Sequence, residues 1–270
     1  MTEAALRLGR RACALHARRW APAAWEVAIV AAGAGLYFLI RGAVSGRAAE
    51  ALERAADLIA IERGLGIYWE PAMQGWILES RALVELFNAL YFWTHMPVII
   101  AVAVWLFARH RAVYRFTRSA FLASAAIGLA IYYALPTAPP RLLPEAGLLD
   151  TMAIYSQLSY QAQEVGPFVN AYAALPSLHF GWALLIAVAL WMARPRGRRG
   201  AALAAALGGL LVLGQGVSIV VTGNHFLLDA VAGAAVAGLG VLAALGWRCY
   251  RGSREAATVA ESEERKSAWP

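Results

Sequence analysis

Charged residues are scarce in this 270-residue chain: 15% of the residues are charged, 60% are hydrophobic, and the mean hydropathy is +0.55. A soluble globular domain is nearer a quarter charged and half apolar. The composition therefore excludes an ordinary soluble domain, and so high an apolar content also excludes a disordered or collagen-like chain. A membrane protein with several transmembrane spans is the class that remains.

Cysteine and lysine are also nearly absent. The two cysteines, Cys13 and Cys249, are too few for a disulfide scaffold. Lys266 is the only lysine among 24 basic residues, so the net charge of +7 comes from arginine. In a membrane protein basic residues mark the cytoplasmic side, and we therefore expect no nucleic-acid partner.

Six apolar stretches approach the about 20 residues that a transmembrane helix needs. Glycine, alanine and leucine dominate them, and lipid-exposed backbone must satisfy its own hydrogen bonds, so we predict helices rather than barrel strands. The predicted fold is all-α, with six transmembrane helices. The stretches are 25–44, 86–108, 119–135, 178–193, 201–222 and 226–247.

Arginines gather in every second connection between these stretches, whereas the loop 136–176 contains Arg141 alone and the turn around Asn224 contains none. The positive-inside rule then predicts a multi-pass cell-membrane protein with both termini in the cytoplasm. Acidic residues outnumber arginines between 47 and 81, and Leu52, Ala55 and Ile59 recur there at helical spacing, which predicts interfacial helices on the outer face. The expected regions are a basic cytoplasmic N-terminus (1–23), a six-helix membrane catalytic domain (24–247) and a disordered cytoplasmic tail (248–270).

Polar residues at the membrane boundaries are costly and usually functional. His225 and Asp229 are four positions apart in GNHFLLD, so they share one face at the start of the sixth stretch. A carboxylate placed there can accept the proton of one imidazole nitrogen and leave the other nitrogen free as a nucleophile or base. The same spacing also fits a plain helix start, in which Asp229 only caps the helix and interacts with its dipole.

Two further motifs are equally open when each is taken alone. Ser177 and His179 begin the fourth stretch in LPSLHFG, where Pro-Ser is ordinary capping chemistry but a helix N-terminus is also an anion site. Arg141 ends PTAPPR after the third stretch, as a phosphate ligand or as an arginine anchored among lipid headgroups. The predicted topology brings all three motifs to one membrane depth, and together they favour metal-free phosphoryl transfer by a histidine nucleophile.

In this order the three motifs resemble those of the type 2 phosphatidic acid phosphatase superfamily. PTAPPR, LPSLHFG and GNHFLLD are most similar to its inositol-phosphoceramide synthase branch, the inositolphosphotransferases, and the resemblance covers about residues 83–246. It implies that His225 is the nucleophile, that Asp229 orients it and that His179 is the acid on the leaving oxygen. It also implies that Arg141 and Ser177 hold phosphate oxygens, with no metal and no cofactor.

Two positions depart from the superfamily pattern. Ala134 stands where the first motif often has a lysine, and Ile219 stands where the third motif often has an arginine. Fewer phosphate-binding cations argue against a generic phosphatase of soluble headgroups and agree with the synthase branch.

A polar stripe runs along the second stretch at spacings of three, three and four, which places its residues on one helix face. Such a stripe either makes interhelical hydrogen bonds or lines a pocket for the headgroup or acceptor, over which the long outer loop can close. The stripe consists of Glu85, Asn88, Tyr91 and His95, and the polar residues of the loop are Asp150, Tyr155, Tyr160 and Asn170.

These patterns predict an integral membrane lipid phosphotransferase at the extracytoplasmic face. It would act on a lipid phosphate or phosphorylated headgroup through a phosphohistidine and transfer it to an alcohol such as a polyol. A lipid phosphate phosphatase that only hydrolyses has the same motifs and stays open. A non-catalytic lipid carrier or flippase and a metalloenzyme with His179, His225 and Asp229 as ligands are remoter alternatives. The expected partners are membrane lipids, and no protein partner is indicated.

Overall fold

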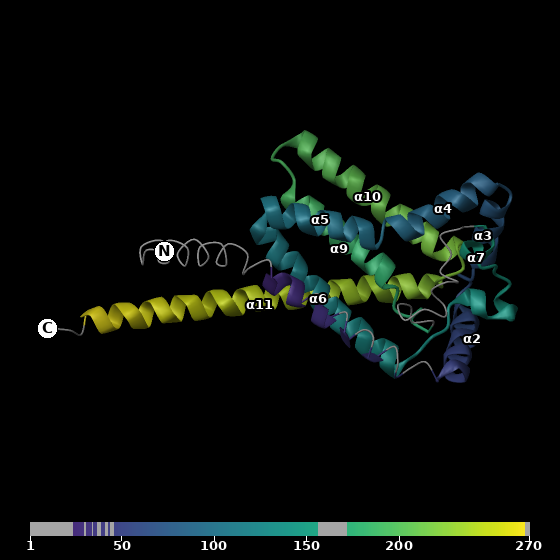
Figure 1. The fold of residues 1–270 in the computed structure, drawn as a ribbon, viewed down its shortest axis with the longest axis horizontal. Coiled ribbons are helices and arrows are strands. Elements are labelled where there is room, and N and C mark those ends of the chain that lie inside the picture. Colours follow the sequence, from purple (N-terminus) through teal and green to yellow (C-terminus); the bar gives the residue numbers. More distant parts are fainter. Residues whose placement is uncertain are drawn as a thin grey trace, which may run out of the picture.

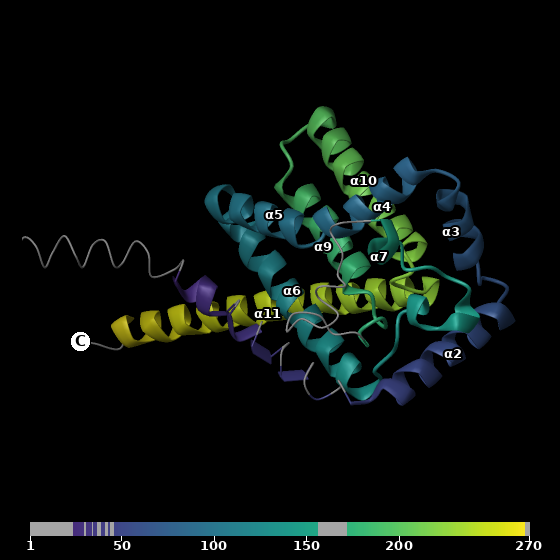
Figure 2. The ribbon, with the colours of Figure 1, turned by 45° about the vertical axis from the view of Figure 1, so that its right-hand side comes forward.

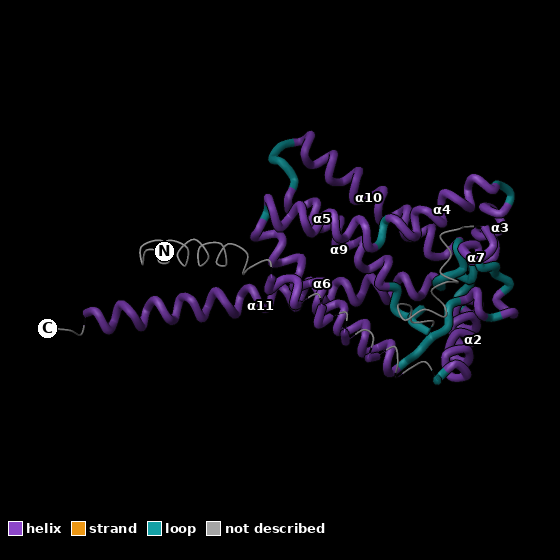
Figure 3. Tube along the Cα trace, viewed as in Figure 1, coloured by secondary structure: helices purple, strands orange, loops and turns teal. Residues whose placement is uncertain are grey.

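Every regular element in the described part of this chain is a helix. The computed structural model describes residues 46–155 and 172–267, with parts of 24–43. Figure 3 shows helices joined by loops throughout this part, with no strand in it. The predicted all-α fold is confirmed for the described residues.

Most of the described helices form a bundle, and the remaining elements gather at one end of it (Figure 1). The bundle contains α4 (Arg81–Trp93), α5 (Met96–Arg109), α6 (Arg111–Ala134), α9 (Leu178–Ala193), α10 (Arg198–Val221) and α11 (Leu227–Ser267). The elements at its end are α2 (Ala48–Gly64), α3 (Glu70–Leu78), η1 (Pro140–Leu142), η2 (Pro144–Ala146) and α7 (Thr151–Tyr155).

Two of the described helices are long and apolar enough to cross a membrane, namely α10 and the Leu227–Arg254 part of α11. The pair α4 and α5 would make a third span, bent by 43°. The apolar α9 is shorter, as is the described helix Ala24–Gly33. These apolar helices indicate a membrane protein, whereas the number of six spans stays a prediction.

The bend divides the predicted stretch 86–108 into two helices at His95. α4 ends at Trp93, and Pro97 stands in the first turn of α5. Proline has no N–H to continue the helical hydrogen bonds, and its ring crowds the preceding turn. The chain therefore breaks before Pro97, and the break brings the ring of His95 against that of His179 on α9.

The last helix extends beyond its apolar part, whereas the division of the chain into three regions, with a disordered tail, stays a prediction. α11 continues as a helix through the described residues to Ser267. Its last segment, 254–267, is rich in alanine, glutamate and arginine, which are strong helix formers. Helix propensity therefore extends the apolar helix beyond its apolar part, and α11 projects from the bundle in Figure 1.

α11 lies across α6 and α9, and Figure 2 shows this crossing from a second side. A Cβ at Gly233 would lie 2.1 Å from the carbonyl oxygen of Ser177, and one at Gly181 would lie 2.5 Å from the carbonyl oxygen of Gly233. Small residues at helix crossings let the two backbones approach closely. Gly233 therefore allows the start of α9 to touch the second turn of α11.

Helices α2 and α3 occupy the segment in which the sequence predicts outer interfacial helices; their place at the membrane surface stays a prediction, and the buried face of α2 agrees with the predicted one at Ala55 and Ile59 but not at Leu52. Leu52 is 37% exposed, whereas Ala51, Ala55, Leu58 and the carboxyl-bearing Glu62 are buried. α2 and α3 lie beside the start of α11 in Figures 1 and 2. The arginine-rich connections between α5 and α6 and between α9 and α10 lie at the other end of the bundle.

Candidate active site

Backbone hydrogen bonds hold the three sequence motifs together. The N–H of Thr137 donates to the carbonyl of Tyr172 at 3.0 Å, and the N–H of Ala174 donates to that of Thr137 at 3.1 Å. The N–H of Arg141 donates to the carbonyl of Gly223 at 3.0 Å. The segments after α6, before α9 and before α11 are thus side by side, as the topology predicted.

Gly223 makes this junction possible. Its φ of +76° is in the left-handed region, and a Cβ there would lie 2.7 Å from the carbonyl oxygen of Leu149. Only glycine meets both conditions without strain. The chain turns sharply there between α10 and α11, and the next two residues, Asn224 and His225, point into the buried end of the bundle, where they are 7% and 4% exposed.

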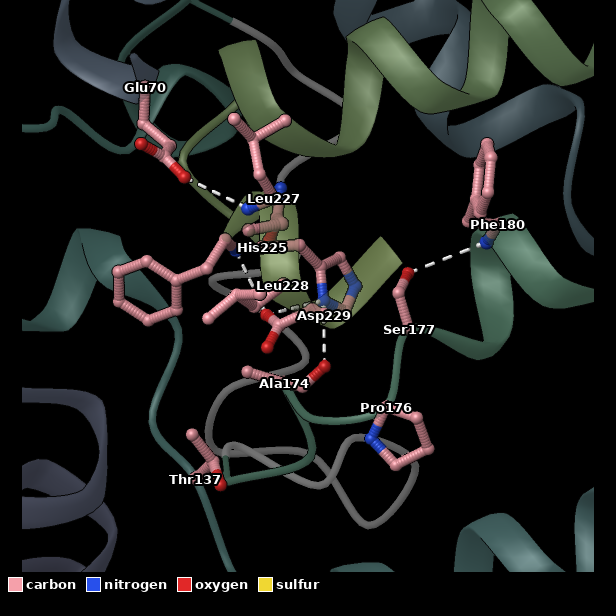
Figure 4. A network of polar contacts seen from close by, with 12 residues as sticks. Glu70, Thr137, Ala174, Pro176, Ser177, Phe180, His225, Leu227, Leu228 and Asp229 are labelled. Atoms are coloured by element: carbon pink, nitrogen blue, oxygen red, sulfur yellow. Dashed lines mark hydrogen bonds and ion pairs between the residues drawn. The ribbon is translucent and has the colours of Figure 1, made fainter. Parts of the chain in front are cut away.

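The protonation of His225 follows from its neighbours (Figure 4). Its Nδ1 lies 2.9 Å from the carbonyl oxygen of Ala174 and 3.3 Å from Oδ2 of Asp229. A carbonyl oxygen can only accept a hydrogen bond, and an ionised carboxylate also only accepts. The neutral ring therefore carries its proton on Nδ1 and has a lone pair on Nε2, which is the tautomer that a nucleophile needs.

Asp229 both caps the helix and contacts the imidazole of His225, so its geometry agrees with both alternatives that the sequence left open. Its Oδ2 accepts the N–H of Phe226 at 2.9 Å, and its carbonyl accepts the N–H of Ser177 at 2.9 Å. The side chain is completely buried, and Oδ1 has no hydrogen-bond partner among the described residues. Asp229 thereby connects the first turn of α11, the LPSLHFG segment and the imidazole of His225.

His179 faces His225 across the site, with ring centroids 5.7 Å apart. Its Nε2 is buried and has no hydrogen-bond partner in the described part of the chain. The ring stacks against Tyr91 at 4.5 Å and against His95 at 3.8 Å between centroids. Two members of the predicted polar stripe therefore reach the site.

The other two members of the stripe lie elsewhere. Glu85 is exposed and forms an ion pair with Arg81 at 2.8 Å, one turn away on the same helix. Asn88 is buried, and its amide exchanges two hydrogen bonds with Thr151 at 2.9 and 2.7 Å, which fasten α4 to α7. Asn88 therefore makes the interhelical contacts that the sequence allowed as an alternative. Tyr160 and Asn170 are outside the described residues.

The phosphate-ligand candidates already have protein partners. The oxygen of Ser177 accepts the N–H of Phe180 at 3.4 Å, as a helix cap, while its O–H can still donate. Arg141 donates to the side-chain oxygen of Asn224, and its Nε lies 3.1 Å from Oδ2 of Asp150. The side chain of Arg141 is 8% exposed, and its bond to Asn224 places it beside the loop that carries His225.

Two buried carboxyl groups, which the sequence patterns did not reveal as site residues, hold the start of α11. Oε1 of Glu70 accepts the N–H of Leu227 at 2.9 Å, and Oε1 of Glu62 accepts the N–H of Leu228 at 2.8 Å. Neither glutamate has any exposed surface. The sequence feature that could have revealed Glu62 is its spacing, because it continues the buried face of α2 one turn beyond Leu58.

The two positions that depart from the superfamily pattern occupy different surroundings. Ile219 is completely buried, and its carbonyl accepts the backbone N–H of His225 at 3.0 Å. Ala134 is the last residue of α6 and is exposed. Ile219 therefore supports the loop that carries His225 through its backbone, and neither position supplies a cation to the site.

Compared with known protein families, the chain matches the PAP2 superfamily over residues 56–243. The chain belongs to the PAP2 superfamily. This is a superfamily of phosphatases and phosphotransferases, so membership supports a lipid phosphatase or phosphotransferase activity. Comparisons with curated proteins and with solved structures gave no match.

The matched region of this PAP2 chain contains every site residue described above, from Glu62 to Asp229. The inositol-phosphoceramide synthase branch stays a prediction. Within the described residues, no group of three or more His, Cys, Asp or Glu side chains is placed to hold a metal ion. His179, His225 and Asp229, the ligands of the metalloenzyme alternative, are therefore not arranged as such a group.

Proposed function

We propose that this PAP2-superfamily chain is a six-span membrane phosphotransferase that acts on a lipid phosphate or phosphorylated headgroup at the extracytoplasmic face, without a metal. The observation that carries the proposal is the fixed tautomer of His225, whose Nδ1 proton is directed at Ala174 and Asp229. Such a ring presents its Nε2 lone pair to phosphorus. The ring of His179 lies close to that of His225, with 5.7 Å between centroids, which supports His179 as the acid on the leaving oxygen.

In the first step, Nε2 of His225 attacks phosphorus, an N–P bond forms, and the P–O bond to the lipid alcohol breaks. His179 transfers a proton to the departing oxygen, so the leaving group is a neutral alcohol. The positive charge that develops on the His225 ring is stabilised by Asp229 through the Nδ1–H hydrogen bond. Arg141, the hydroxyl of Ser177 and the free amides of the first turn of α9 offset the charge of the phosphate oxygens.

In the second step, an alcohol attacks the phosphohistidine and His179 accepts its proton. The N–P bond breaks, a new P–O bond forms, and His225 recovers its starting tautomer. Water can take the same place, which is the hydrolytic alternative. The proximity of Tyr91 and His95 to His179 supports transfer, because an acceptor must be bound and oriented to compete with water.

The test is to trap the intermediate. Purified protein is mixed with a lipid substrate that carries a radiolabelled phosphoryl group, quenched in base, and examined for protein-bound phosphate that is stable in base and released by acid. Wild type should become labelled, and His225→Ala should not. His110→Ala, at the first turn of α6 away from the site, is the matched histidine control and should be labelled like wild type. Turnover by the His225→Ala protein would end the proposal.

His179→Ala separates the two steps. With a natural lipid substrate this variant should turn over slowly, because the departing alkoxide lacks its proton donor. A substrate with a nitrophenol leaving group needs no such proton, so labelling should recover while release of phosphate to acceptor stays slow. Activity of the wild type in the presence of EDTA would agree with metal independence, and strict dependence on an added metal would contradict it.

A further inference from the structure

Glu62 and Glu70 form a buried pair of carboxyl groups behind His225. Each uses Oε1 to accept one backbone N–H from the first turn of α11, and Figure 4 shows the bond from Leu227 to Glu70. The side chains of the two glutamates are neighbours, and the proximity of Glu70 raises the pKa of Glu62. They come from different helices, α2 and α3, and are separated by the turn 65–69.

The second oxygens of the two carboxyl groups would be unfavourable if both groups were ionised. Oε2 of Glu62 and Oε2 of Glu70 are both buried, and neither has a donor among the described residues. Two ionised carboxylates cannot hydrogen-bond each other, because each only accepts. Like charges that share a buried site also repel, which favours protonation of one of them.

We propose that Glu62 and Glu70 share one proton between their Oε2 atoms, and that this acid–carboxylate pair positions the His225 loop by holding the first turn of α11. One O–H donor satisfies both unpartnered oxygens, while the two Oε1 atoms continue to accept the amides of Leu227 and Leu228. The remaining single negative charge lies at the helix N-terminus, where it is favourable. The catalytic consequence rests on the proposed function, whereas the shared proton does not.

The charges around the pair support this assignment. Burial, then the proximity of Glu70, raises the pKa of Glu62 to about 8, although the Leu228 amide opposes the change. Asp229 on α11 adds a further negative charge that raises the pKa of Glu62. Tyr68, in the α2–α3 turn, lies near both carboxyl groups and near Arg63, and Asp229 lies near both Glu70 and His225. The guanidinium of Arg63 lies over the ring of Tyr68, 4.9 Å from its centroid.

The shared proton predicts that the free energy of unfolding falls as the pH rises. The pKa of Glu62 rises from 4.5 for an exposed glutamate to about 8 in the folded protein. Between these pH values the folded protein holds a proton that the unfolded chain has released, so stability falls as the pH rises through this window. Above about pH 8 the proton is lost from both states, the two carboxylates repel each other, and the first turn of α11 loosens.

Glutamine substitutions provide the test, because one carboxamide imitates the protonated partner. In Glu62→Gln, the side-chain oxygen can still accept the N–H of Leu228, and the NH2 group can donate to Glu70. In the double variant Glu62→Gln/Glu70→Gln, two NH2 groups face each other with no acceptor. Glu53→Gln, on the exposed side of α2, is the matched control.

The purified full chain is examined by infrared spectroscopy for a protonated carboxylic acid, by thermal unfolding across pH 5 to 9, and by kcat against pH. Wild type should show the acid band, which disappears near pH 8, and Glu62→Gln should lack it. Glu62→Gln should keep most of the activity and lose both the fall in stability with pH and the alkaline fall in kcat. The double variant should lose about tenfold or more in kcat, because the histidine loop is misplaced.

The two parts of the proposal can fail separately. Absence of the acid band in wild type, or a Glu62→Gln protein as unstable as Glu62→Ala, would overturn the shared proton whatever reaction the chain catalyses. If the band and the stability profiles are as expected but kcat has the same alkaline fall in Glu62→Gln and wild type, the positioning role is overturned. If neither the wild type nor any variant transfers phosphate, the proposed function fails. The infrared and unfolding results still test whether Glu62 and Glu70 share a proton.

Discussion

The carbonyl oxygen of Ala174 lies closer to Nδ1 of His225, at 2.9 Å, than Asp229 Oδ2 does, at 3.3 Å. Ala174 belongs to the segment that leads into α9, whereas His225 and Asp229 belong to the start of α11. The tautomer of His225 therefore depends on the contact between two motifs as well as on the carboxylate one helical turn away. Asp229 contributes the negative charge, and Ala174 contributes a second, neutral acceptor.

Asp229→Asn should therefore lose less activity than it would if Asp229 were the single acceptor of the Nδ1 proton of His225. The Ala174 carbonyl still accepts the Nδ1 proton, so the ring keeps the useful tautomer, but the charge that stabilises the cationic ring is lost. We expect kcat to fall by about a hundredfold, a typical size for one group that assists a histidine. Steady-state kinetics with a lipid phosphate measure this. An Asp229→Asn protein as inactive as His225→Ala would show that Ala174 does not hold the tautomer.

Asp229→Ala should be the more damaging change for folding. It also removes the acceptor of the Phe226 N–H at the start of α11, and loss of a helix cap costs about 1 kcal/mol. Thermal unfolding of the two variants under the same conditions measures the difference. Equal melting temperatures for the Asn and Ala variants would contradict the capping role.

The ion pair between Arg141 and Asp150 leads to a prediction about the binding of inorganic phosphate. Asp150 lies 3.1 Å from Nε of Arg141 and competes with a phosphate for the same guanidinium. Arg141→Ala should weaken inhibition by inorganic phosphate about tenfold, the loss of one charge-assisted hydrogen bond. Asp150→Asn should strengthen that inhibition, because the competing charge is gone. Arg81→Ala removes an exposed arginine that is paired with Glu85, and it should leave the inhibition by inorganic phosphate unchanged.

The close crossing of α9 and α11 predicts that a larger residue at Gly233 lowers the stability of the fold. Gly233→Ala would place a Cβ 2.1 Å from the Ser177 carbonyl, and backbone must move to relieve the clash. Overpacking of this kind costs about 1–3 kcal/mol, and the Asp229–Ser177 backbone bond should weaken with it. Gly238→Ala, on the same helix with no atom within 4 Å of its Cβ, should be neutral or stabilising. Melting temperatures compare the two, and equal losses would refute the close approach.

The local part of the site could be predicted from sequence, because spacing of three or four residues fixes which side chains share a helix face. His225 with Asp229 is such a case. The partners of the α11 amides could not be predicted, because Glu70 and Glu62 are 157 and 166 positions away from them in the chain. The Ala174 acceptor is a backbone carbonyl, and no residue type reveals which carbonyl faces a histidine.

The polar stripe shows the limit of a pattern that crosses a helix break. A regular helix from Glu85 to His95 would place both ends on one face, but the chain bends before Pro97 and the bundle covers only part of α4. Tyr91 and His95 therefore meet His179, whereas Glu85 remains at the surface. Helix spacing predicts the face of a helix, and tertiary packing decides how much of that face is buried.

Membrane sidedness is predicted from the arginines, and the fold offers two well-separated reporter positions. In a chain with Cys13 and Cys249 replaced by serine, Glu145→Cys in η2 should react with an impermeant thiol reagent on intact cells. Arg196→Cys, in the connection between α9 and α10 at the other end of the bundle, should react only after lysis. Both side chains are exposed, so burial does not explain a difference. The reverse pattern of labelling would place the site in the cytoplasm.

The last prediction concerns the fate of the phosphohistidine, which we expect to be transferred to an alcohol. Water is abundant at a membrane surface, so an acceptor wins only when a pocket binds and orients it, an advantage worth several kcal/mol. His95 is placed to belong to such a pocket, because its ring stacks on His179, the proposed base of the second step, and on Trp182 at 5.3 Å. Asn88 is less suited, because its amide is already used by Thr151.

His95→Ala should therefore move the products from transfer toward hydrolysis while phosphohistidine formation stays close to the wild-type rate. The measurement gives purified enzyme a lipid substrate with inositol or another polyol and separates transferred product from free phosphate. Glu85→Gln, at the exposed end of the same stripe, is the control and should keep the wild-type ratio. Asn88→Ala should lower the stability and leave the ratio unchanged, because it breaks the contact between α4 and α7. If wild type releases only free phosphate with every alcohol offered, the protein is a lipid phosphatase and the proposed transfer is wrong.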